Sequence, residues 1–122
     1  MGKIANIKQK AIDNEYFRQV LETGKHVQIV VMHIPPAGEI GAEIHPDNDQ
    51  VLYLVQGEGT VYLEEQPAPF NEGDCVLVPA GTKHNFVASD DQPMKIITTY
   101  SPPHHPDGTI HKTKAEADAS EA

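Results

Sequence analysis

Short apolar runs separated by turn residues make up most of this chain. Apolar residues recur in segments 26–34, 50–56, 60–64, 74–78, 84–88 and 94–100, and glycine, proline, aspartate or asparagine lies between them. Segment 50–56 is apolar on both faces, as expected of a strand that is buried on both sides. Short strands at regular spacing with such turns predict an all-β fold, either a sandwich or a barrel.

The pattern is weaker toward both ends of the chain. Residues 39–45 are expected to form one more short strand, closed by Pro46. Residues 16–21 fit either a helix capped by Gly24 or the first strand of a hairpin with a turn at 23–25, and we favour the hairpin. Residues 1–13 have no clear period and are expected to be an irregular N-terminal extension. Residues 112–122 are charged and alanine-rich, and we expect a disordered tail or a short helix. The barrel domain is therefore expected over residues 14–111.

Length and charge narrow the class of protein. A chain of 122 residues suits one domain. The formal net charge of −9 is repelled by phosphate backbones and by anionic membrane surfaces, so neither nucleic acid nor a membrane is an expected partner. No apolar run reaches the length of a signal peptide or a membrane span, and we expect a cytoplasmic protein.

Cysteine and histidine usage bear on the chemistry. The single cysteine, Cys75, excludes an internal disulfide, and its apolar run suggests a small buried side chain. Histidine is the commonest metal ligand, and the chain has seven histidines. Glu43 and His45 stand at i and i+2 and point to one face of a strand, although such a pair alone is more often a solvated face.

Two segments carry a family resemblance. The first reads Glu43-Ile-His45-Pro-Asp-Asn-Asp-Gln50, with Gly57 after six further residues. The second reads Gly73-Asp-Cys-Val-Leu-Val-Pro79-Ala-Gly81-Thr-Lys-His84. Together they resemble the two motifs of the cupin superfamily, and the small single-domain bacterial cupins of cupin 2 type, often described as sugar-phosphate-isomerase-like.

The first segment departs from the family pattern more than the second. Glu43 stands where the family usually has its first histidine, and Gln50 stands where it usually has a glutamate. Gly38 comes one residue late, and Ala88 replaces the terminal asparagine of the second motif. The carboxylate and the amide have thus exchanged places, while the glycine, proline, glycine and histidine of the second motif keep the family spacing.

The resemblance implies a single-domain antiparallel jelly-roll β-barrel with a metal site inside one end. It implies one divalent metal ion (Mn, Fe, Ni, Co or Zn) held by Glu43, His45, Gln50 and His84, and a homodimer. The implied activity is isomerase, lyase or dioxygenase chemistry on a sugar, sugar acid or dicarbonyl, and a glutamine ligand resembles cupins that act on uronate-type sugars. A non-catalytic barrel that binds a small molecule is the alternative.

Further side chains are candidates for narrower roles. The general base is not evident, and the candidates are His33, Tyr53, Tyr62, Tyr100 and His104. Arg18 and Lys83 either bind an anionic substrate or are solvated surface charges. His104, His105 and His111 could form a second metal cluster, but we favour a segment that packs against the barrel mouth or a partner chain. Strand parity predicts that Leu52, Leu54 and Phe86 line the barrel, whereas Tyr53 lies in the core or an interface.

Overall fold

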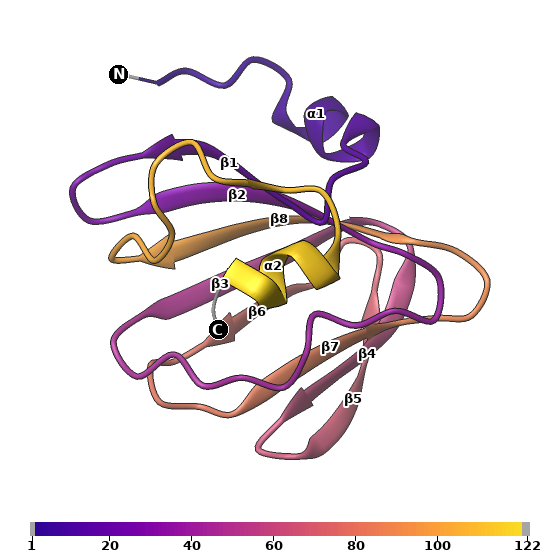
Figure 1. Cartoon of the computed structure of the whole chain (residues 1–122). Helices are drawn as coiled ribbons and strands as arrows, with labels where there is room; N and C mark the ends of the chain where they lie inside the picture. Colours follow the sequence, from indigo (N-terminus) through magenta and orange to yellow (C-terminus); the bar gives the residue numbers. More distant parts are fainter. Residues whose placement is uncertain (1, 121–122) are drawn as a thin grey trace.

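The computed structural model describes residues 2–120, and two antiparallel sheets face each other across one core (Figure 1). The larger sheet has the order β6-β3-β8-β2-β1-β9 and the smaller has the order β5-β4-β7. The strands are β1 (Arg18–Thr23), β2 (Gln28–Ile34), β3 (Asp49–Gln56), β4 (Glu58–Leu63), β5 (Gln66–Asn71), β6 (Cys75–Val78), β7 (His84–Ala88), β8 (Met94–Ser101) and β9 (Ile110–His111). The predicted antiparallel jelly-roll barrel is confirmed.

Alternate residues of each strand fill the space between the sheets. Leu52, Leu54 and Phe86 are fully buried there, as strand parity predicts. They belong to one cluster with apolar side chains from both sheets, which keeps water out of the barrel interior. The predicted hairpin is also confirmed, because β1 and β2 pair in antiparallel register from Arg18 opposite Met32 to Thr23 opposite Gln28.

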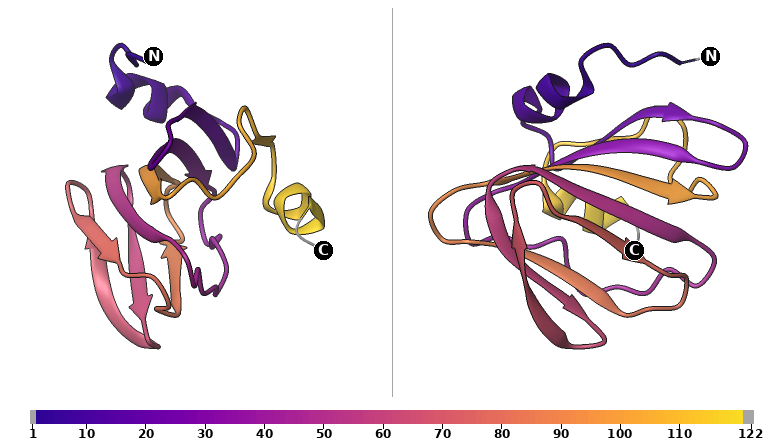
Figure 2. Two further views of the ribbon diagram at one scale, coloured as in Figure 1. Left: turned by 90° about the vertical axis from the view of Figure 1, so that its left-hand side faces the viewer. Right: turned by 180° about the vertical axis from the view of Figure 1, so that it is seen from behind.

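Two short helices pack outside the barrel (Figure 2). Helix α1 (Ile7–Asp13) lies in the region expected to be irregular, so that expectation is wrong. Ala11 is fully buried against Val31 and Val55 of the larger sheet, and this packing stabilises a helix too short to form alone. Helix α2 (Lys114–Ser120) realises the short-helix alternative for the tail, and Ala117 anchors it to the core. Residues 121 and 122 of that tail lie outside the described residues.

Residues 39–45 do not form the strand predicted for them. They make two isolated bridges to β7, Glu39 with Val87 and Glu43 with His84. Gly41 between them has a φ of 111°, which takes the backbone out of the extended conformation and interrupts the ladder. Figure 1 shows this segment running beneath α2, at the open side between the sheets.

Strand β5 is absent from the sequence prediction because Pro67 and Pro69 interrupt its pattern. It is an edge strand of the smaller sheet, where a missing N–H can face away from the ladder. Cys75 is exposed, so its expected burial is wrong. It lies on edge strand β6, opposite Tyr53, on the outer face of the larger sheet. Between residues 2 and 120, no helix is long and apolar enough to cross a membrane.

Candidate metal centre

Glu43, His45 and His84 meet inside the barrel. The backbones of Glu43 and His84 exchange two hydrogen bonds of 3.0 Å, which fixes these residues side by side on neighbouring segments. Oε1 of Glu43 lies 3.3 Å from Nε2 of His45 and 4.0 Å from Nε2 of His84. One potential ligand atom from each residue falls within 4.8 Å of the other two. This spacing suits three ligands that share one cation.

The tautomer of His84 presents a lone pair to this centre. Its Nδ1 lies 2.9 Å from the carbonyl oxygen of Thr82, which can only accept a hydrogen bond. The ring hydrogen is therefore on Nδ1, and Nε2 carries the lone pair. Nε2 is buried and has no hydrogen-bond partner among residues 2–120. A backbone carbonyl that orients a histidine in this way is typical of metal ligands.

Gln50 adds a neutral oxygen to the same interior. Its side chain is buried, and Nε2 donates a 3.0 Å hydrogen bond to Oγ1 of Thr98. The remaining Oε1 atom is buried without a hydrogen-bond partner among the described residues. Gln50 also pairs in register with Tyr100, whose ring contacts that of His45 at 5.7 Å between centroids.

The donor set fits a divalent metal ion. Nε2 of His45, Oε1 of Gln50 and Nε2 of His84 are all buried without a well-aligned hydrogen bond in the described chain. An unsatisfied buried polar atom costs about 1–3 kcal/mol, so three in one barrel need a common explanation. A cation that accepts their lone pairs beside the Glu43 carboxylate supplies one.

The protonation states also suit a metal. Burial raises the pKa of Glu43, but the hydrogen bond from His45 and the charges of His45, His84 and Arg18 together outweigh it and hold this pKa below its usual value. Burial lowers the pKa of His84 and outweighs the opposing effects of the Thr82 carbonyl and Glu43. At neutral pH the site therefore offers a carboxylate and a neutral imidazole, the forms that bind metals.

Two of the five general-base candidates lie near this centre. The His104 ring is 4.5 Å from that of His45 between centroids and stacks on Tyr100 at 5.5 Å. His33 is not in the site, because it points to the outer face of β2, toward Glu15. Tyr53 and Tyr62 also have outward parity, on β3 and β4. The second metal cluster does not form, because within residues 2–120 only Glu43, His45 and His84 bring three such ligand atoms together.

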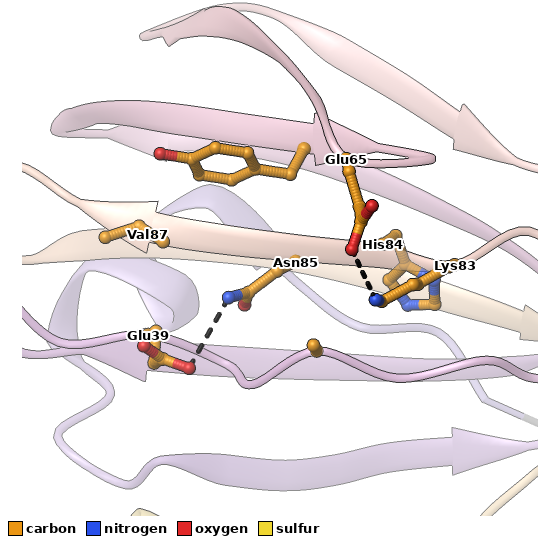
Figure 3. Close-up of a pocket in the computed structure, with 8 residues that line it drawn as sticks. Glu39, Glu65, Lys83, His84, Asn85 and Val87 are labelled. Atoms are coloured by element: carbon orange, nitrogen blue, oxygen red, sulfur yellow. Dashed lines mark hydrogen bonds and ion pairs between the residues drawn. The ribbon is translucent and has the colours of Figure 1, made fainter.

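Of the two candidates for binding an anionic substrate, one is buried and the other points outward. Arg18 is 3% exposed and its Nη1 lies 3.1 Å from Nδ1 of His111. Lys83 points outward and pairs with Glu65 at 2.7 Å, at the edge of a cavity of about 450 Å³ on the outer side of β7 (Figure 3). Asn85 and Glu39 also line that cavity, which lies outside the barrel. Arg18 therefore remains a candidate for binding an anionic substrate near the metal centre, whereas Lys83 lies away from that centre.

Sequence reasoning missed two residues that position the site. Thr98 holds the amide of Gln50, and Gln28 binds the backbone of His104 and His105. Both are fully buried. The signal was available, because each is a polar residue at an inward position of an otherwise apolar strand, Gln28 before Val30 and Thr98 after Ile96.

A family model and two curated relatives match most or more than half of this chain. The family model for the cupin domain matches residues 30–100. The protein YrkC of Bacillus subtilis is 40% identical over 97% of this chain and 67% of its own length. The protein L612 of Acanthamoeba polyphaga mimivirus is 33% identical over 96% of this chain and 76% of its own length.

Solved structures agree. The crystal structure of BH2720 from Bacillus halodurans is 38% identical, covers 98% of this chain and 95% of that chain, and superposes with a TM-score of 0.93. The structure of KdgF from Halomonas sp. is 25% identical, covers 71% of this chain and 78% of that chain, and has a TM-score of 0.66. With the barrel and the matched family model together, this chain belongs to the cupin superfamily.

Proposed function

We propose that this cupin binds one divalent metal ion through Glu43, His45, Gln50 and His84. We further propose that the site acts on a small polyoxygenated molecule, a sugar, sugar acid or dicarbonyl, by isomerase or lyase chemistry. The observation that carries the proposal is the convergence of Glu43, His45 and His84, with a buried Nε2 atom on each histidine that has no well-aligned hydrogen bond among the described residues. Two histidines and a carboxylate suit Mn, Fe, Co, Ni or Zn.

The residues around the metal centre have different roles in the proposed chemistry. A bound metal would supply Lewis acidity, which polarises a carbonyl and acidifies the adjacent C–H group. The negative charge of Glu43 offsets part of the cation's charge. Leu52, Leu54 and Phe86 exclude water from the inner side. His104 is exposed at the barrel mouth and touches His45, so it can take a proton from a molecule at the centre and release it to solvent.

Metal content tests the ligand set directly. The protein is purified without added metal and analysed by mass spectrometry, beside the variants His84→Ala, Gln50→Ala and His33→Ala. We expect about one ion per chain in the parent, severe loss in His84→Ala, partial loss in Gln50→Ala, and no loss in His33→Ala, whose ring lies outside the barrel. Equal metal content in all four proteins would refute the assignment.

The identity of the metal then separates the reaction classes. Iron with oxygen consumption would favour dioxygenase chemistry over our proposal. Manganese, nickel or zinc with turnover that does not need oxygen would support isomerase or lyase chemistry. A metal-loaded protein that binds sugars but converts none in a broad sugar and dicarbonyl screen would favour the non-catalytic binding protein.

We also propose that two copies pair through the outer face of the larger sheet. Helix α1 covers only part of that face. Beyond it, Leu77 and Tyr53 are 59% and 39% exposed, and Cys75 lies beside Tyr53 in the same rows. An exposed apolar patch is typical of a protein interface.

A further inference from the structure

The segment that carries Glu43 contains one residue more than the part of β7 that it faces. Its two bridges join Glu39 to Val87 and Glu43 to His84, so they are four residues apart along the segment and three apart along β7. The extra residue makes a β-bulge. It falls at Gly41, whose φ of 111° departs from an extended backbone.

This bulge decides which side chains of the segment face the barrel interior. Alternate residues of an extended segment point to opposite faces, so Glu43 would share the outward direction of Glu39 if the extra residue were missing. Ile40 is buried in the core, whereas Glu39 and Ala42 line the cavity on the outer side of β7. Glu43, the next residue, meets the two histidines inside the barrel. The bulge therefore turns the carboxylate toward the metal centre.

A bulge displaces backbone groups from the ladder, and the side chain of Asn85 provides an acceptor for two of them. On β7, the N–H groups of His84 and Ala88 donate to backbone carbonyls of the segment at 3.0 and 2.8 Å. The N–H of Phe86 faces the same side, because alternate N–H groups of a strand do so, but it donates to Oδ1 of Asn85 at 2.8 Å. The same oxygen accepts the N–H of Gly41 at 2.9 Å. One side-chain oxygen thus replaces the partners that the bulge removes.

Asn85 restrains the segment at the residue with the most backbone freedom. Glycine reaches more backbone conformations than any other residue, so a single conformation at Gly41 depends on bonds made by its neighbours. Asn85 follows His84 on β7, and Gly41 precedes Glu43 by two residues. The bond between them therefore ties two of the proposed metal ligands together from outside the barrel. Figure 3 shows the amide of Asn85 on that outer side, where its Nδ2 donates to Oε1 of Glu39 at 3.4 Å.

We propose that Asn85 is a positioning residue of the metal centre, because it holds the bulge at Gly41 that turns Glu43 toward the cation. The inference rests on the proposed function and adds to it a residue that acts only through the backbone of the segment. Its role is separate from that of Thr98, which binds the amide of Gln50 inside the barrel.

Cobalt binding to the full chain tests the proposal. The metal-free protein is titrated with Co²⁺, and binding is followed by the visible absorption of the ion, which depends on the geometry of its ligands. Asn85→Ala removes the acceptor of the Gly41 N–H, and we expect the Kd for Co²⁺ to rise about 10- to 100-fold. At saturating Co²⁺ the spectrum of this variant should also differ from that of the parent, because Glu43 is displaced. A residue that only stabilises the fold would leave that spectrum unchanged.

Two further variants assign the effect to the Asn85 oxygen. The double variant Asn85→Asp with Glu39→Gln keeps an acceptor for Gly41 and exchanges the amide and the carboxylate between the two side chains. It should restore the parent Kd and spectrum, and a double variant as weak as Asn85→Ala would overturn the proposal. Val87→Ala is the matched control and should bind Co²⁺ like the parent, because Val87 lines the same outer cavity on the same strand.

Amide hydrogen exchange in the parent keeps the test decisive if Asn85→Ala does not fold. The N–H of Gly41 should be protected to a degree similar to that of Glu43, whose N–H donates to the carbonyl of His84. Exchange of Gly41 at the rate of an unstructured chain would show that the Asn85 oxygen does not hold the bulge, and would refute the proposal.

The failures of the two proposals are distinguishable. If the parent binds Co²⁺ and a folded Asn85→Ala protein binds it with the same Kd and spectrum, the positioning role is refuted and the metal site stands. If the parent binds no Co²⁺, the proposed function fails, and the positioning role fails with it.

Discussion

Replacing Thr98 by valine tests whether Gln50 presents its amide oxygen to a metal. Thr98 is fully buried on β8, and its Oγ1 accepts the hydrogen bond from Nε2 of Gln50 at 3.0 Å. Valine keeps nearly the same shape and removes the acceptor. The amide of Gln50 then has no partner that fixes which of its two ends faces the barrel interior.

The magnitude has two parts. Without metal, Nε2 of Gln50 loses its partner in a buried position, which should lower the free energy of unfolding by about 1–3 kcal/mol. With metal, loss of a residue that orients a ligand typically weakens metal affinity about 10- to 100-fold. At a free metal concentration about 100 times the parent Kd, metal should stabilise the parent by about 2.7 kcal/mol and Thr98→Val by only about 0.4–1.4 kcal/mol.

Urea unfolding with and without the metal measures both parts. The matched control is Thr99→Val, because Thr99 neighbours Thr98 on the same strand but has outward parity. We expect the control to keep the full metal-induced gain. If Thr98→Val keeps the same metal-induced gain as the parent, the orientation of the Gln50 amide is irrelevant to metal binding and our reasoning is refuted.

Three further predictions concern Gly57 in the barrel, the pKa of His105, and Leu77 on the outer face of the larger sheet. Gly57→Ala should lower the free energy of unfolding by about 2–4 kcal/mol in urea, because Gly57 has a φ of 110° and a Cβ atom there would lie 2.3 Å from the carbonyl oxygen of Pro93; a loss below about 1 kcal/mol would contradict this. Burial and nearby positive charge lower the pKa of His105 from 6.5 to about 3 on folding. Between these pH values the unfolded chain binds more protons than the folded chain, so the free energy of unfolding should fall as the pH drops from 6.5 to 3. His105→Gln should reduce that slope in urea unfolding at stepped pH, and an unchanged slope would assign it to other groups. Light scattering should show a dimer for the parent protein and a monomer for Leu77→Lys, and a monomeric parent protein would disprove the interface.

Most of the barrel could be predicted because its strands are bounded by residues with a backbone constraint. Proline and glycine at Pro35, Gly57 and Pro79 end strands for reasons local to the chain. Helix α1 was missed because it depends on the burial of Ala11 against a sheet formed later in the sequence. Cys75 was misplaced because an apolar run on an edge strand looks the same in sequence as one in the core.

The metal centre could be predicted only in part. The order of Glu43, His45 and His84 carries the family spacing, and the structure brings these residues together. The contact between Arg18 and His111 could not be found, because it spans 93 residues of sequence and depends on tertiary packing. Strand parity did hold the information for Gln28 and Thr98, as polar residues at inward positions.

The placement of the carboxylate at position 43 and of the neutral amide at position 50 has a physical basis in this barrel. Gln50 is 2% exposed and its partner, the Thr98 hydroxyl, is uncharged, so a carboxylate there would be desolvated without a cation until metal arrived. The side chain of Glu43 is 23% exposed and lies beside two imidazoles, in the field of Arg18. The negative charge thus stands at the position that solvates it better. The barrel can therefore fold before the metal binds, with the neutral amide of Gln50 buried more deeply than the carboxylate of Glu43.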